Sequence, residues 1–140
     1  MHDQPNAVEL IAAARHYLET DLIPNLADAR LRFQTLVAAN VLSIVERELQ
    51  TEEAQLSEEW KFLAKLKILS GSVPAPLGDL RKQVYDANVK LCEQIRAGEF
   101  DERRDFLSLS NEIRRLVDRK LEVANPKYLA GFYGESRKQA

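Results

Sequence analysis

The sequence predicts an all-α protein, an antiparallel bundle of about five helices with a short aromatic C-terminal tail. One observation behind this prediction is that apolar residues recur at helical spacing, and no segment alternates as a strand does. Their stripes are wider than a coiled-coil seam, which favours a globular bundle. A second observation is that the turn residues fall only at the ends of the periodic segments. These residues are Pro5, Pro24, Gly71, Pro74, Pro76, Gly78, Gly98, Pro126, Gly131 and Gly134.

Capping residues mark where the helices begin. Asn6 suits an N-cap, and Glu9, three residues later, completes a capping box. Thr51, Asp79 and Asp101 are the N-caps expected for later helices. The first three expected helices span about 7–22, 29–49 and 52–69. The fourth runs from the N-cap Asp79 to Gly98, which we expect in the left-handed conformation. The fifth runs from the N-cap Asp101 to the residues before Pro126.

The tail after Pro126 carries Tyr128, Leu129, Phe132 and Tyr133. A segment this apolar is unlike a linker, so we expect it to pack on the bundle or on a partner.

Length and composition indicate one domain spanning residues 1–140. A chain of 140 residues with 45% hydrophobic content can bury a core without disulfides or a structural metal. The single cysteine, Cys92, excludes an internal disulfide and a cysteine-rich zinc site, and we expect it in the core. No apolar run is long enough to span a membrane, and the N-terminus lacks a signal-peptide pattern. We therefore expect a cytoplasmic protein of bacterial type that does not enter membranes.

The function classes are limited by charge and by motifs. A net charge of −2 argues against nucleic-acid binding, which needs a basic face. The chain contains no glycine-rich phosphate loop and no nucleophile elbow. We therefore expect no cofactor and no metal, and we favour a protein that is not an enzyme.

Four polar residues interrupt the apolar arcs of the expected helices. Asn40 borders the arc of the second helix and Glu48 lies within it, while Asn88 interrupts the fourth helix and Lys120 the fifth. In one interpretation Glu48 and Lys120 pair or extend to water, and the amides bond backbone carbonyls. In the other, these residues line a polar pocket that binds a small ligand.

Several segments share their order and spacing with a known group of proteins. The most specific are Val37-Ala38-Ala39-Asn40 and Val123-Ala124-Asn125-Pro126-Lys127-Tyr128-Leu129; the others lie at 1–5, 30–33, 45–49, 95–99 and 120–122. Together they resemble a bacterial family of small helical domains of unknown function. Members of that family occur alone or joined to aminoglycoside-phosphotransferase-like proteins, often encoded near acyl-CoA dehydrogenases. The resemblance therefore implies an accessory role beside such proteins.

The resemblance also draws attention to Arg32, Asn125 and Tyr128. The candidate ligand-binding residues are accordingly Arg32, Asn40, Glu48, Asn88 and Lys120.

Two functions remain open. In the first, the chain is an interaction module. Its partner is a phosphotransferase-like protein, an acyl-CoA dehydrogenase or another acyl-CoA-metabolising protein, or a second copy of the chain in a homodimer. The apolar residues around Trp60 and Phe62, together with the tail, are the expected contact surface. The alternative is a small-ligand pocket, which is enzymatic in one form of the hypothesis.

Overall fold

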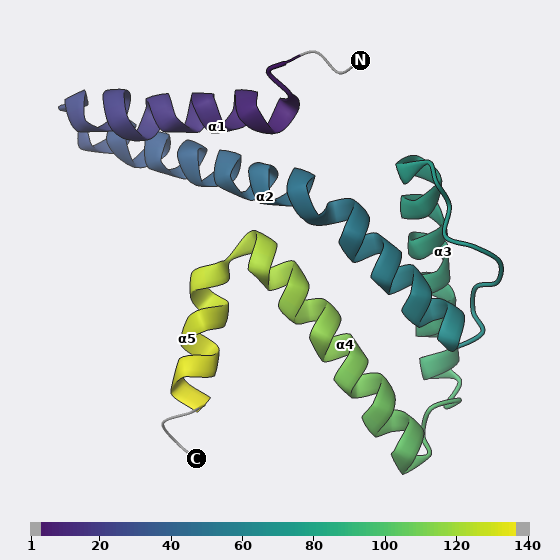
Figure 1. The fold of residues 1–140 in the computed structure, drawn as a ribbon. Helices are drawn as coiled ribbons and strands as arrows, with labels where there is room; N and C mark the ends of the chain where they lie inside the picture. Colours follow the sequence, from purple (N-terminus) through teal and green to yellow (C-terminus); the bar gives the residue numbers. More distant parts are fainter. Residues whose placement is uncertain (1–3, 137–140) are drawn as a thin grey trace. The chain divides into compact units, whose positions relative to one another are not determined.

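The computed structural model describes residues 4–136, and this part of the chain is helical without strands (Figure 1). The all-α helical bundle is thereby confirmed. The chain forms two compact units, which we call unit 1 (described over residues 4–51) and unit 2 (described over residues 52–136). The helices are α1 (Ala7–Tyr17), α2 (Ala29–Lys65), α3 (Leu77–Arg96), α4 (Arg103–Ala124) and α5 (Pro126–Ser136).

Helix α2 runs without a break through the junction at which we expected one helix to end and another to begin. The expectation that Thr51 caps a separate helix is wrong. The Thr51 hydroxyl instead donates to the Arg47 carbonyl oxygen at 2.9 Å, the bond to the preceding turn that an interior helical threonine makes. With no glycine or proline between residues 29 and 65, nothing stops the helix there.

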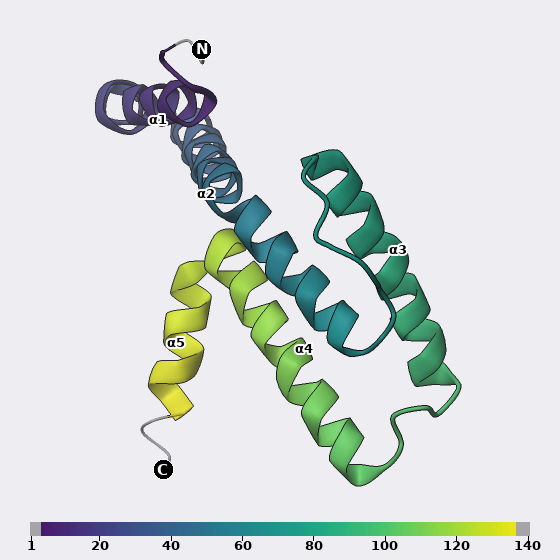
Figure 2. The same cartoon turned by 45° about the vertical axis from the view of Figure 1, so that its right-hand side comes forward.

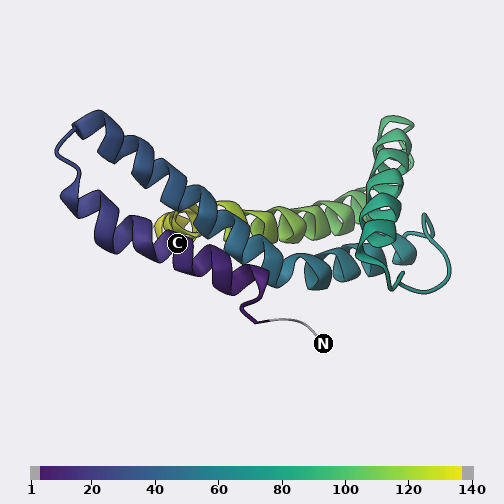
Figure 3. The same ribbon diagram turned by 90° about the horizontal axis from the view of Figure 1, so that it is seen from above.

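Unit 1 is a helical hairpin in which α1 and the first half of α2 lie side by side and antiparallel (Figures 1 and 3). The predicted capping box is confirmed: Glu9 N–H donates to Asn6 Oδ1 at 3.0 Å, and Asn6 N–H donates to Glu9 Oε2 at 2.7 Å. After α1, a π turn (Leu18–Leu22) and a 3-10 turn (Ile23–Asn25) lead to α2, which Asp28 begins by accepting from the N–H of Leu31 at 3.0 Å.

Unit 2 combines the last turns of α2 with α3, α4 and α5. In Figures 1 and 2, α4 runs antiparallel to the end of α2, while α3 follows the same general direction as α2. The connection between Lys65 and Leu77 is long enough to return along the helix before α3 begins. The core of unit 2 joins these three helices through Trp60, Phe62, Leu63, Leu80, Val84, Ala87, Leu91 and Leu109.

The ends of the later helices differ slightly from the expected ones. Helix α3 begins at Leu77, after Pro76, and Glu102 takes the N-cap position of α4, so the expectation that Asp79 and Asp101 are N-caps is wrong. Gly98 has a φ of +81°, which confirms the left-handed residue expected after α3. The aromatic tail is itself helical: Asn125 ends α4 and its Oδ1 accepts from the N–H of Tyr128 at 3.1 Å, so it also begins α5.

Candidate functional site

The five candidate ligand-binding residues belong to both units. Arg32, Asn40 and Glu48 lie on the first half of α2 in unit 1, and all three are exposed. In unit 2, Asn88 on α3 is half-buried, and the Lys120 side chain on α4 is 69% exposed. The structure brings Asn88 and Lys120 to a common partner, the carboxylate of Glu59.

Glu59 is the polar residue at the interior of unit 2, with a side chain only 8% exposed. Asn88 Nδ2 donates to Glu59 Oε1 at 2.7 Å and also to the Val84 carbonyl oxygen at 2.9 Å. Lys120 Nζ lies 4.0 Å from Glu59 Oε2. A buried carboxylate needs such partners, because removing it from water without them is strongly unfavourable. The cluster therefore ties α2, α3 and α4 together.

Sequence reasoning missed Glu59, although a signal for it was present. Glu59 follows Leu56 by three residues and precedes Leu63 by four, so it lies on the core face of its helix. It is a polar residue within an apolar arc, the same pattern that marks Asn88 and Lys120.

Trp60 and Phe62 correct another expectation. Both are buried in the core of unit 2, so they are not the exposed contact surface that their apolar character suggested. Trp60 Nε1 donates to Gln83 Oε1 at 3.1 Å, which satisfies its one polar atom. Cys92, expected in the core, is exposed on α3.

A cavity of about 260 Å³ lies between α2 and α4 of unit 2. Most of its lining is charged: the residues are Glu58, Lys61, Phe62, Lys65, Glu112, Arg115, Leu116 and Arg119. Arg119 forms an ion pair with Glu58 across the two helices, and Arg115 Nη1 lies 2.8 Å from Glu112 Oε1 within α4. Neither Lys61 nor Lys65 has an ion-pair partner among the residues that the structure describes.

Unit 1 carries a different feature, a row of four apolar side chains on α2, of which three are exposed and Ile44 is half-buried. We call Phe33, Val37, Val41 and Ile44 the α2 stripe, because their spacing of four, four and three residues places them on one helix face. Phe33, Val37 and Val41 are 66%, 47% and 50% exposed. Asn40 borders the stripe, and Glu48 continues its line one turn further.

The other face of this helix is turned toward α1. Ala39 is buried there, and Glu46, two turns later, accepts from Arg15 Nε of α1 at 3.0 Å. Val37 and Val41 lie roughly 160° around the helix from Ala39 at 100° per residue. Helix α1 therefore covers one face of α2 and leaves the α2 stripe uncovered within unit 1.

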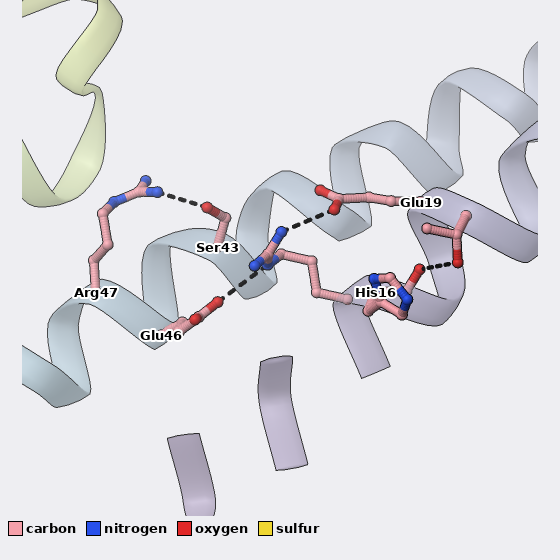
Figure 4. A network of polar contacts seen from close by, with 7 residues as sticks. His16, Glu19, Ser43, Glu46 and Arg47 are labelled. Carbon is pink, nitrogen blue, oxygen red and sulfur yellow. Dashed lines mark hydrogen bonds and ion pairs between the residues drawn. The ribbon is translucent and has the colours of Figure 1, made fainter. Parts of the chain in front are cut away.

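A polar network joins the two helices of unit 1 (Figure 4). Arg15 bridges Glu19 of its own segment, at 2.8 Å, and Glu46 of α2, while the Arg47 guanidinium donates to the Ser43 hydroxyl. His16 takes part through its backbone, whose carbonyl oxygen accepts from Thr20 at 2.8 Å. The network fixes the hairpin and contains no nucleophile activated by a base.

Two hydrogen bonds between helices of unit 2 each shift the pKa of one of their partners. The hydrogen bond that Glu52 accepts from Arg81 holds the pKa of that carboxyl below its usual value of 4.5. The Tyr133 hydroxyl donates to Asp118, which raises the pKa of the phenol. Both contacts join helices, α2 to α3 and α4 to α5, so they are structural.

Within residues 4–136, no three histidine, cysteine, aspartate or glutamate side chains gather closely enough to hold a metal ion. None of the described helices has the length and apolar character needed to cross a bilayer.

Comparison with known proteins gives one match. No curated protein and no solved structure matches the chain significantly. A family model described as a domain of unknown function, DUF6285, matches residues 24–128, well over half of the chain. The match begins in the 3-10 turn before α2 and ends in the first turn of α5. The chain therefore belongs to the DUF6285 family of domains of unknown function.

Proposed function

We propose that the chain is a non-enzymatic interaction module that pairs with a second copy of itself through the α2 stripe. The observation that supports this proposal is the row of half-exposed apolar side chains on the α2 face opposite α1. Two helices alone cannot enclose a core, and a two-helix unit with an apolar outer face is completed when two copies form a four-helix bundle. We place the module in the cytoplasm, as the sequence led us to expect.

The size of the α2 stripe sets the expected strength of the pairing. Burying the exposed part of each side chain contributes about 1 kcal/mol, so eight side chains from two copies contribute about 8 kcal/mol. This is of the same order as the entropy lost on association. We therefore propose a reversible dimer whose population depends on concentration.

Asn40 gives the pairing a register. A single amide beside an apolar seam favours the alignment in which it meets a partner, because other alignments leave it unpaired. In a twofold dimer each residue near the axis meets its own counterpart, so Asn40 is suited to bond Asn40 of the other copy.

Substitution of Val37 by glutamate tests the pairing. In Val37→Glu a charge would have to be buried in the interface, so we expect a monomer at concentrations where the wild-type chain is dimeric. Light scattering after size-exclusion chromatography measures the mass. Val89→Glu is the matched control, because Val89 is 45% exposed on α3 of unit 2, and we expect it to dimerise like the wild type.

Circular dichroism of both variants verifies that the helices form. A folded Val37→Glu chain with the dimerisation of the wild type would rule out the α2 stripe as the interface.

The family resemblance adds a second partner for the same surface. We propose that a phosphotransferase-like or acyl-CoA-metabolising protein competes with the second copy for the α2 stripe. Co-expression of a phosphotransferase-fold candidate with the wild type and with Val37→Glu tests this proposal. Equal recovery with both chains would place that contact elsewhere.

The alternative function is small-ligand binding in unit 2, at the candidate residues Asn88 and Lys120. The convergence of Asn88 and Lys120 on Glu59 favours it, since an amide, an amine and a carboxylate lie close together there. A thermal-shift screen with nucleotides, acyl-CoA thioesters and sugar phosphates tests it, because a ligand that binds the folded state raises the melting temperature. No shift with any of these compounds would argue against this alternative.

A further inference from the structure

We infer that the cavity between α2 and α4 of unit 2 is an anion site for a small phosphorylated metabolite, whose phosphate group lies between the basic side chains of the two helices. The inference is independent of the α2 stripe, which belongs to unit 1. It rests on the charge of the cavity, on the state of its ion pairs and on its size.

The charge of the lining favours an anion. Lys61 and Lys65 on α2 and Arg115 and Arg119 on α4 supply four positive charges, and two glutamates supply the only negative ones, so the cavity carries a net charge of +2. The chain as a whole has a net charge of −2, so this excess is local. A phosphate monoester carries nearly two negative charges at neutral pH and matches it.

The acids of the cavity are already engaged. Glu58 pairs with Arg119, and Glu112 pairs with Arg115, so each carboxylate holds one guanidinium at the cavity wall. A guanidinium oriented in this way still has free N–H groups, and its planar fork suits a phosphate oxygen pair.

The lysines supply the uncompensated charge. Lys61 and Lys65 are one helical turn apart on the same face, where like charges repel and weaken the helix. Neither has an ion-pair partner among the described residues. A bound dianion removes this repulsion and gives both ammonium groups a charged acceptor.

The volume of the cavity and its apolar lining residues limit the kind of ligand that fits. A volume of about 260 Å³ lies just below the range of typical drug-sized pockets, so a small phosphorylated compound fits better than a whole dinucleotide. Phe62 and Leu116 supply an apolar surface against which the carbon skeleton of such a compound can lie.

Isothermal titration calorimetry of the full chain with inorganic pyrophosphate and with glycerol phosphate tests the inference. We expect saturable binding that weakens as salt is raised, since partly exposed charges are screened. The double variant Lys61→Gln/Lys65→Gln should bind pyrophosphate at least about tenfold more weakly, because two charge-assisted contacts are lost. Lys61→Arg/Lys65→Arg, which keeps both charges, should retain binding.

The control Lys90→Gln/Lys127→Gln removes two exposed lysines from α3 and α5, so it has the same net charge as the test variant. We expect its affinity for pyrophosphate to stay within about twofold of the wild type. Three results would overturn the inference: no binding by the wild type at millimolar pyrophosphate, equal loss in both glutamine variants, or malonate binding as tightly as pyrophosphate. The last result would indicate a site for carboxylates instead of phosphates.

Discussion

Glu59 illustrates at the scale of one residue how unit 2 is held together. Its carboxylate lies among the apolar side chains of the core and receives a hydrogen bond from Asn88 on the neighbouring helix. A polar group in such a place costs little while it is paired and much when it is not. The amide is therefore a structural residue as well as a candidate ligand-binding one.

Asn88→Ala removes this donor and leaves the buried carboxylate, among the described residues, with only the lysine ammonium at 4.0 Å. We expect the free energy of unfolding to fall by about 1–3 kcal/mol, measured by urea denaturation. Asn111→Ala, at an exposed position of α4, is the control, and it should change stability by no more than about 0.5 kcal/mol. Equal effects of the two substitutions would show that the Asn88–Glu59 bond does not contribute.

Glu52 predicts a dependence on pH. Its pKa is lower in the folded chain, chiefly because of the hydrogen bond from Arg81, so the folded state favours the ionised form. The resulting stability is present above the unfolded pKa, near 4.5, and is lost as the pH falls through the folded value. Glu52→Gln should thus unfold more easily than the wild type at pH 7, by up to about 1 kcal/mol, and this difference should shrink as the pH falls below 4.5.

Glu53→Gln provides the comparison, because Glu53 is exposed and has no ion-pair partner among the described residues. Urea midpoints measured from pH 3 to pH 7 should show the pH-dependent difference for Glu52→Gln alone. A difference that is constant over this range would contradict the assigned role of the Arg81 contact.

At the scale of the elements, the local signals in the sequence predicted some helix ends correctly and others wrongly. Asn6 and Glu9 form the predicted capping box, and Gly98 has the predicted left-handed conformation. The predicted break at Thr51 is absent because a threonine hydroxyl can bond the preceding turn as readily as it caps a new helix. Only the surrounding helix decides between these uses, so the sequence at that point is ambiguous.

Gly98 also allows a prediction at this scale. Its φ of +81° disfavours any other residue, and a Cβ added there would lie 2.9 Å from Asp101 Oδ2. Gly98→Ala should therefore destabilise the chain by at least about 1 kcal/mol. Gly78→Ala, in the first turn of α3 where a Cβ meets no atom within 4 Å, should instead stabilise it by about 0.4–1 kcal/mol. A lower melting temperature for Gly98→Ala and a higher one for Gly78→Ala, each relative to the wild type, would confirm both predictions. A lower melting temperature for both variants would contradict the prediction for Gly78.

At the scale of the whole molecule, the helical class followed from the sequence, whereas the distribution of the candidate residues between two units did not. Periodicity shows which side of a helix is apolar, and this identified the arc of Val37, Val41 and Ile44. It does not show which apolar face a neighbouring helix covers. Trp60 and Phe62 are covered and the α2 stripe is not, although both patterns look alike in the sequence.

The proposed role follows from this difference in coverage. Unit 2 has a core built by three helices, while unit 1 has two helices and retains an apolar face. Such a face is completed by another helix pair, and a second copy of the chain offers one with the same surface. The phosphate site inferred above consists of other residues, all of them in unit 2.

The mass of the wild-type chain in solution, measured by light scattering as its concentration is raised, tests the central claim most directly. The proposal predicts a reversible increase from 16.0 kDa toward twice that mass, and no such increase for Val37→Glu under the same conditions. A wild-type mass that stays at 16.0 kDa up to millimolar concentration would contradict self-association through the α2 stripe.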